Sequence, residues 1–172
     1  METKNKIAKL ERIRKRLNFS NSNYVNPIGA SGGLALWWVD EVNLDILFKS
    51  KHIMRCIVDH VHPDQSWVIS FIYAPPNRSK RREFWKLLID QAKNSNYPWI
   101  CVGDFNQIGS MWEKLGGAEC SRSQIDGFQA VIFECELMDL GFKGCAYTWT
   151  NHQGGEANIR ERQGPCLSGL AC

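Results

Sequence analysis

The sequence predicts one α+β domain, built from two packed β-sheets with flanking helices. The chain has 172 residues, a length typical of a single domain, and its hydrophobic fraction of 44% is enough for a buried core. Segments with apolar residues at helical spacing are mixed with short runs rich in β-branched and aromatic residues. No internal repeat, low-complexity tract or linker divides the chain, so these elements are expected in one layered unit.

The first half of the chain is predicted to form one helix followed by strands. Residues 4–17 carry apolar side chains at spacings of three and four, and Thr3 stands where it can cap the helix. The polar residues 18–30 are expected to form a loop. Runs rich in Ile, Val, Phe, Trp and Tyr then predict four consecutive strands in an antiparallel meander, at residues 34–39, 44–48, 52–60 and 66–73.

The second half is predicted to contain two helices and shorter strands. A helix is expected to begin at Ser79, which follows two prolines, and to stop near Asn94. Residues 99–102 are apolar throughout, which predicts a short strand that is buried on both faces. A further helix is expected at residues 121–136, followed by a pair of strands within residues 138–151.

The charge of the chain is only mildly basic, with a net value of +3. This value permits a nucleic-acid partner without arguing for one. Basic residues are concentrated in two places, the first 17 residues and the cluster Arg78, Lys80, Arg81 and Arg82. Solvated helix faces are the simpler interpretation of both clusters, and contact with phosphate groups is the alternative.

The cysteines and the hydropathy indicate the kind of compartment. The seven cysteines are scattered, with no CxxC pair and no paired Cys/His spacing, so neither a disulfide framework nor a zinc site is expected. No apolar run approaches the roughly 20 residues of a membrane span, and no signal-peptide pattern follows the first residue. The sequence therefore predicts an intracellular protein without a membrane association, in the nucleus or the cytoplasm.

The strongest candidate for chemistry is the pair Asp104 and Asn106, at the end of the strand predicted at 99–102. Alternate residues of an extended chain project the same way, so both side chains can face one phosphate. The carboxylate can orient and deprotonate a water molecule, and the amide can donate a hydrogen bond to a phosphate oxygen. A turn in which both side chains cap their own backbone explains the pair equally well.

Tyr73 and Thr148 are the next candidates. Tyr73 ends a predicted strand, where its hydroxyl could reach a phosphate at the same rim as Asp104; a half-buried strand tyrosine is the simpler interpretation. Thr148 and Asn151 flank Trp149, for which core packing is favoured over stacking on a base.

The remaining candidates carry weaker signals. Glu2 is either a partner of the helix dipole or a metal ligand. The four histidines are interpreted as plain surface residues, because none stands beside an acidic residue in an Asp-His pattern. Candidate contacts to nucleic acid are Arg78, Lys80, Arg81, Trp149, Asn151 and Arg160.

Taken in order along the chain, these residues resemble the endonuclease/exonuclease/phosphatase superfamily, and most closely the endonuclease domain of plant LINE-type (non-LTR) retrotransposons. The central block is Pro98 to Asn106, which ends in Gly-Asp-Phe-Asn. The other blocks are Glu2-Thr3-Lys4, Ser31-Gly32-Gly33-Leu34-Ala35, Ile72-Tyr73-Ala74-Pro75, Glu113-Lys114, Gly116-Gly117, Asp139-Leu140-Gly141-Phe142, Tyr147-Thr148-Trp149-Thr150-Asn151 and Ile159-Arg160-Glu161-Arg162. The resemblance implies a four-layered α/β sandwich of two mixed sheets with helices outside and the active site at one edge.

The resemblance also implies roles for individual residues. Glu2 would ligate Mg²⁺ or Mn²⁺, Tyr73 would contact the scissile phosphate, and Asp104 would align or deprotonate the attacking water. Asn106 would steady the transition state, and Thr148 would be a supporting hydroxyl. DNA is the expected substrate, because the residues of these motifs resemble those of retrotransposon endonucleases. Other members of the superfamily hydrolyse RNA, phosphoinositides or small phosphate esters. No obligate protein partner is implied.

The departures from the family pattern predict an impaired, truncated enzyme. The family's first strand and its Asn would precede Glu2, Gly164 stands where the family has an aspartate, and the final Ser-Asp-His block is missing. We therefore expect a family-like domain at residues 1–162, a divergent tail at 163–172, weak metal binding and little or no cleavage. Two alternatives remain: a remnant that binds nucleic acid without cutting it, and a product too unstable to fold.

Overall fold

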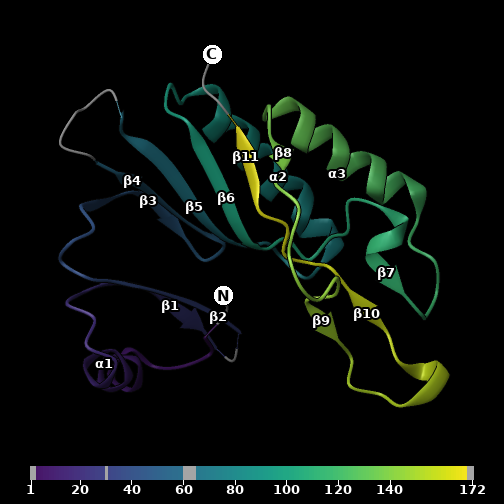
Figure 1. Cartoon of the computed structure of the whole chain (residues 1–172), viewed down its shortest axis with the longest axis horizontal. Helices are drawn as coiled ribbons and strands as arrows, with labels where there is room; N and C mark the ends of the chain where they lie inside the picture. The colour runs from purple at the N-terminus through teal and green to yellow at the C-terminus, as the bar shows by residue number, and fades with distance from the viewer. Residues whose placement is uncertain (1–2, 30, 60–64, 170–172) are drawn as a thin grey trace.

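The computed structural model describes residues 3–29, 31–59 and 65–169. They form the α+β fold that the sequence predicts, with several sheets and three α-helices (Figure 1). The largest sheet has six strands in the order β3-β4-β5-β6-β11-β8. Their bounds are β3 (Leu44–Ser50), β4 (Ile53–Val58), β5 (Trp67–Tyr73), β6 (Trp99–Asp104), β11 (Leu167–Gly169) and β8 (Met138–Asp139).

The predicted meander is right for three of its four strands. β3, β4 and β5 are consecutive and antiparallel, whereas β5 and β6 run parallel. The fourth strand, β2 (Ser31–Trp38), pairs instead with β1 (Asn21–Ile28) in a separate two-stranded sheet. Residues 21–28 were expected in a loop because of their polar composition and a proline. A polar strand with Pro27 is compatible with the edge of a small, half-buried sheet, so that expectation was wrong.

The three predicted helices are present. They are α1 (Ile7–Arg16), α2 (Arg78–Lys93) and α3 (Arg122–Glu134). In α2 the capping residue is Asn77 rather than Ser79, because the Asn77 side chain accepts a hydrogen bond from the backbone N–H of Ser79 at 2.9 Å. None of the helices in the described ranges is long and apolar enough to cross a membrane.

The helices cover the large sheet unequally. In Figure 1, α2 and α3 lie on one side of the six-stranded sheet, and α1 with β1 and β2 lies on the other. The core cluster joins the first side, where Ile72 and Cys101 of the sheet pack with Phe84, Leu88 and Phe128 of the helices. Cys56, Cys101 and Cys135 are free thiols that are buried in the core, where they pack as small apolar side chains. Each of them stands in an apolar run of the sequence.

A third sheet has three strands, all of which follow α2 in the sequence. The sequence analysis had placed these residues in loops and in a strand pair. Its order is β7 (Lys114–Leu115), β10 (Arg160–Glu161) and β9 (Trp149–Thr150). Strands do form within residues 138–151, but β8 pairs with β11 and β9 with β10, not with each other. The predicted pairing was wrong because exposed residues 140–145, with glycines at positive φ, separate the two strands.

The parallel contact between β5 and β6 is unusually close at Gly103. This residue has φ +136°, and a Cβ atom built on it would lie 2.0 Å from the carbonyl oxygen of Ile72. No side chain fits at that distance, so glycine is required where β5 and β6 approach their carboxyl ends.

Gly103→Ala should therefore destabilise the protein by about 3 kcal/mol or more, because the β5–β6 pair must open to admit a methyl group. Gly127→Ala is the matched control. It lies in α3, where a new Cβ meets nothing within 4 Å, and it should stabilise the fold by about 0.4–1 kcal/mol. Urea unfolding measures both changes. Equal effects of the two substitutions would contradict this explanation.

Candidate active site

The carboxyl ends of β5 and β6 bring Tyr73 and Asp104 together. The parallel register places Tyr73 directly opposite Asp104. The backbone N–H of Ala74, the next residue after β5, donates a 2.8 Å hydrogen bond to the carbonyl oxygen of Asp104. Two residues that the sequence predicted at one rim therefore lie side by side there.

Asp104 has one engaged and one open carboxylate oxygen. Its Oδ1 accepts a hydrogen bond from the backbone N–H of Asn106 at 2.8 Å. Within the described part of the chain, Oδ2 accepts none. Burial raises the pKa of the Asp104 carboxyl above its ordinary value of 3.8, while the N–H of Asn106 and the charge of Arg81 act in the opposite direction. A carboxylate with a raised pKa is a better proton acceptor.

Asn106 holds the turn after β6. It adopts a left-handed conformation, with φ 50°, and its Nδ2 donates a 2.8 Å hydrogen bond to the carbonyl oxygen of Ala74. The self-capping turn that the sequence left as an alternative is thus present for Asp104. The Asn106 amide instead reaches across to the end of β5, which leaves its second N–H and its Oδ1 for other partners.

Phe105 anchors the same loop from below and connects it to Thr148. Its side chain is fully buried and packs on Phe128 at 5.6 Å between ring centroids. The Phe105 backbone N–H donates to the carbonyl oxygen of Gln163 at 2.9 Å, and the Gln163 N–H donates to Oγ1 of Thr148 at 3.1 Å. Thr148 is therefore joined to the Asp104 loop through Gln163, a residue that the sequence analysis did not single out.

The chain after Gln163 passes directly beside the site. A Cβ atom at Gly164 would lie 2.9 Å from the carbonyl oxygen of Gly103, so a larger residue there requires one of the two segments to shift. Leu167 then pairs with Cys101 in β6. Residues 163–169, whose sequence departs from the family pattern, thus pack along the strand that carries Asp104.

A buried ion cluster behind this segment joins three distant parts of the sequence. Nη1 of Arg162 lies 2.8 Å from Oε1 of Glu113 and 2.6 Å from Oδ2 of Asp139. The side chains of Arg162 and Glu113 are 3% and 6% exposed, so neither charge is solvated well without the other. The Arg162 guanidinium also lies over the rings of Trp112 and Phe142. This cluster holds the tail in place next to β6.

The predicted contacts to nucleic acid have different surroundings. Arg78 and Lys80 are exposed. Arg81 is buried, and its guanidinium donates to the carbonyl oxygens of Pro75 and Pro76, so it holds the β5–α2 turn.

The candidates in the three-stranded sheet are also divided. Trp149 is 42% exposed, so the favoured interpretation of core packing was wrong. The amide of Asn151 is engaged within its own loop, where it bonds to Gln153, Ala157 and Ile159. Arg160 is exposed and lies over the ring of Tyr147.

His52 lies beside the candidate site, which the sequence analysis did not predict. The sequence interpreted it as a plain surface histidine, but it is half-buried and its Nδ1 lies 2.9 Å from the carbonyl oxygen of Tyr73. A carbonyl only accepts, so Nδ1 carries the proton and Nε2 of the neutral ring is an acceptor. The signal was available: in an antiparallel pair, the start of the strand at 52–60 must lie beside the end of the strand at 66–73.

The described residues do not by themselves complete a divalent-cation site. Glu2, the metal ligand implied by the family resemblance, lies outside the described residues, as do His60 and His62. In the ranges that the structure describes, no three His, Cys, Asp or Glu side chains gather as a metal-binding group. Mg²⁺ prefers six oxygen ligands, of which Asp104 and Asn106 supply few.

Asp104→Asn should raise the thermal midpoint of unfolding at neutral pH, because an amide avoids the cost of burying a charge and its Oδ1 still accepts the Asn106 N–H. The folded-state pKa of Asp104 is raised, so the wild-type carboxylate destabilises the fold only above its unfolded pKa. The gain should shrink as the pH falls toward 3.8. Circular-dichroism melts across this range measure it, and a gain that grows toward acid would contradict it.

Comparison with known proteins identifies the fold. No model of a known protein family matches the sequence, and no characterised protein of similar sequence was found. Solved structures do match. The endonuclease domain of TRAS1, a telomere-specific non-LTR retrotransposon, superposes with a TM-score of 0.66 at 12% identity, over 96% of this chain and 81% of that one.

Two further matches are of the same kind. Danio rerio TDP2 complexed with a single-strand DNA product has a TM-score of 0.56 at 14% identity, over 95% of this chain and 67% of that one. An endonuclease/exonuclease/phosphatase family protein from Bacteroides thetaiotaomicron has a TM-score of 0.56 at 12% identity, over 95% and 64%. At these identities the likeness is one of fold: the chain has the fold of endonuclease/exonuclease/phosphatase-type domains.

Proposed function

We propose that the chain carries a divalent-metal phosphodiesterase site for nucleic acid at the carboxyl ends of β5 and β6, and that cleavage by this site is impaired. The observation that carries the proposal is the open Oδ2 of Asp104, on a carboxyl of raised pKa, in register with Tyr73. A carboxylate and a phenol at one sheet rim can act on the same phosphate.

Each residue has a role that its contacts permit. Asp104 aligns a water molecule through Oδ2 and accepts its proton. Tyr73 donates its hydroxyl to a phosphate oxygen, and the second N–H of Asn106 donates to the charge that develops on the phosphate. Thr148 is a positioning residue, because it acts through Gln163 and the backbone of Phe105. Mg²⁺ or Mn²⁺, when bound, supplies positive charge to the phosphate, with Glu2 as a further ligand.

The fold supports nucleic acid as the substrate class. The TRAS1 structure is the endonuclease domain of a retrotransposon, and the Danio rerio TDP2 structure holds a single-strand DNA product. DNA as the substrate, and an origin in a plant LINE-type element, remain parts of the proposal that rest on the sequence blocks around Asp104.

Two features support impairment. Gly164 offers no carboxylate, and its position against Gly103 leaves no room for one without a shift. Among the described residues, the other carboxylate whose charge acts on Asp104 is Glu161, and it is paired with Lys114 at 2.8 Å. Groups that position water, metal and phosphate act as a unit, so losing one removes most of the rate.

A second candidate function is binding without cleavage. It is favoured by the exposed cations Arg78 and Lys80 beside a site whose Asn106 amide is partly committed to the turn. Binding of this kind needs phosphate contacts and no positioned water.

Purified protein should not nick supercoiled plasmid above background with millimolar Mg²⁺ or Mn²⁺. A missing acid, base or electrostatic donor typically costs about 10²-fold or more in rate, so the glycine at position 164, where the family pattern has an aspartate, is expected to place the rate below detection. Asp104→Ala should then behave like the unmodified chain, and so should Asp126→Ala, a control on the exposed face of α3. Gel electrophoresis of the plasmid forms is the measurement. Metal-dependent nicking that disappears in Asp104→Ala but persists in Asp126→Ala would show that the site is intact.

A further inference from the structure

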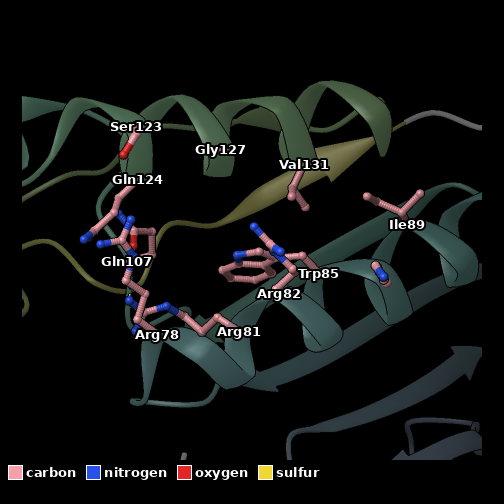
Figure 2. A pocket seen from close by; sticks show the side chains of 11 residues that line it. Arg78, Arg81, Arg82, Trp85, Ile89, Gln107, Ser123, Gln124, Gly127 and Val131 are labelled. Atoms are coloured by element: carbon pink, nitrogen blue, oxygen red, sulfur yellow. Dashed lines mark hydrogen bonds between the residues drawn. The ribbon is translucent and has the colours of Figure 1, made fainter.

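Three hollows follow the start of α2 and are not explained by the site at Asp104. The first lies beside Tyr73 and is lined by Lys51, His52, Asn77 and Lys80 among others. The second is lined by Asn77, Arg78, Ser79 and Arg82. The third lies between α2 and α3 and has Arg82, Trp85 and Lys86 in its wall (Figure 2).

Neighbouring hollows share lining residues. Asn77 lines both the first and the second, and Arg78 and Arg82 line both the second and the third. The three hollows therefore follow one another from Tyr73, opposite Asp104, around the amino end of α2 to the groove between the two helices. The part along α2, from Arg78 to Lys86, is about 12 Å long at 1.5 Å per helical residue.

The surface is positively charged along its length. Five exposed or lining cations follow it in the order Lys51, Lys80, Arg78, Arg82 and Lys86, which we call the basic track. Among residues 3–29, 31–59 and 65–169, no aspartate or glutamate lines any of the three hollows. None of the five cations forms an ion pair with another residue in the ranges 3–29, 31–59 and 65–169.

The potential of these charges is felt inside the first hollow. Burial lowers the pKa of His52, and the charges of Lys51 and Lys80 lower it further. Both lysines therefore act on the same small volume, and neither forms an ion pair with a residue in the described ranges. An anion that entered the hollow would meet two ammonium groups at once.

The far end of the track offers a stacking surface. Figure 2 shows Trp85 and Arg82 projecting from α2 into the space below α3, with Val131 directed toward them. Trp85 is half-buried, and Phe128 backs it at 5.1 Å between ring centroids. Gly127 of α3 lines the same hollow and has no side chain to fill it. The space beside it is empty, because a Cβ atom built there would meet nothing within 4 Å. The volume of about 320 Å³ falls in the range of small-molecule sites.

We propose that the basic track guides a single strand of nucleic acid away from the Asp104 rim and around the start of α2, and that one base stacks on Trp85. Phosphates lie along the cations, and an aromatic ring flanked by Arg82 and Lys86 receives the base. A single strand is required, because a base that is paired in a duplex does not reach a ring between two helices. The proposal rests on the proposed function in one respect: the nucleic-acid strand is taken to begin at the Asp104 rim. Binding of the strand along the basic track needs neither metal nor cleavage.

The test measures binding of a short fluorescent oligothymidine by anisotropy in EDTA. Arg82→Gln/Lys86→Gln should lower the slope of log K against log salt by about 1.4, because each lost contact to a single strand removes about 0.7. Lys93→Gln, at the other end of the same helix and outside the hollows, should leave the slope unchanged. An unchanged slope in the double variant would overturn the track.

The stacking end has its own control. Trp85→Leu should bind the oligothymidine about tenfold more weakly. Because Trp85 also packs in the core, an abasic oligonucleotide of equal length tests the same contact on the unmodified protein, and it should bind about tenfold more weakly too. Equal binding of the abasic strand, or equal competition by a duplex, would overturn the stacking at Trp85. Since no cleavage is scored, these outcomes are independent of whether the Asp104 site cuts.

Discussion

The close parallel pairing of β5 and β6 at Gly103 is the constraint on which the rest of the site depends. Without a side chain at this position, the carbonyl oxygen of Ile72 approaches the backbone, and the register that results sets Tyr73 opposite Asp104. Ala74 then bonds to both Asp104 and Asn106, which closes the turn. Phe105 fixes the turn to the core, so one carboxylate oxygen is held open at the rim with little freedom to move.

Local patterns predicted the elements that surround this site. The apolar spacing in the second and third helices reports a buried face, and both helices do pack on the large sheet. The apolar run before Asp104 reports a strand covered on both sides. The rim position of Tyr73 and Asp104 was also predicted, although the sequence analysis did not predict that β5 and β6 run parallel.

What the sequence did not reveal depends on partners far along the chain. Residues 21–28 become a strand because β2 pairs with them, not because of their own composition. Arg81 was a candidate contact to phosphates, and in the structure its guanidinium donates hydrogen bonds to the carbonyl oxygens of Pro75 and Pro76. The Arg162 cluster joins residues separated by 49 and 23 positions, and no spacing rule connects them. For the same reason the sequence did not show that the lysines of the basic track line one surface, because they come from the β3–β4 turn and from α2.

The account assigns the chemistry of this chain to one rim, where Asp104 aligns the attacking water beside the metal and the described residues supply few metal ligands. Titration of ¹⁵N-labelled protein with Mn²⁺ tests this most directly, because the paramagnetic ion broadens the amide signals nearest to it. The account predicts selective broadening at Tyr73, Asp104, Phe105 and Asn106 at millimolar Mn²⁺, and its loss in Asp104→Asn. Uniform broadening, or broadening centred elsewhere that persists in Asp104→Asn, would contradict a metal-dependent site at the carboxyl ends of β5 and β6.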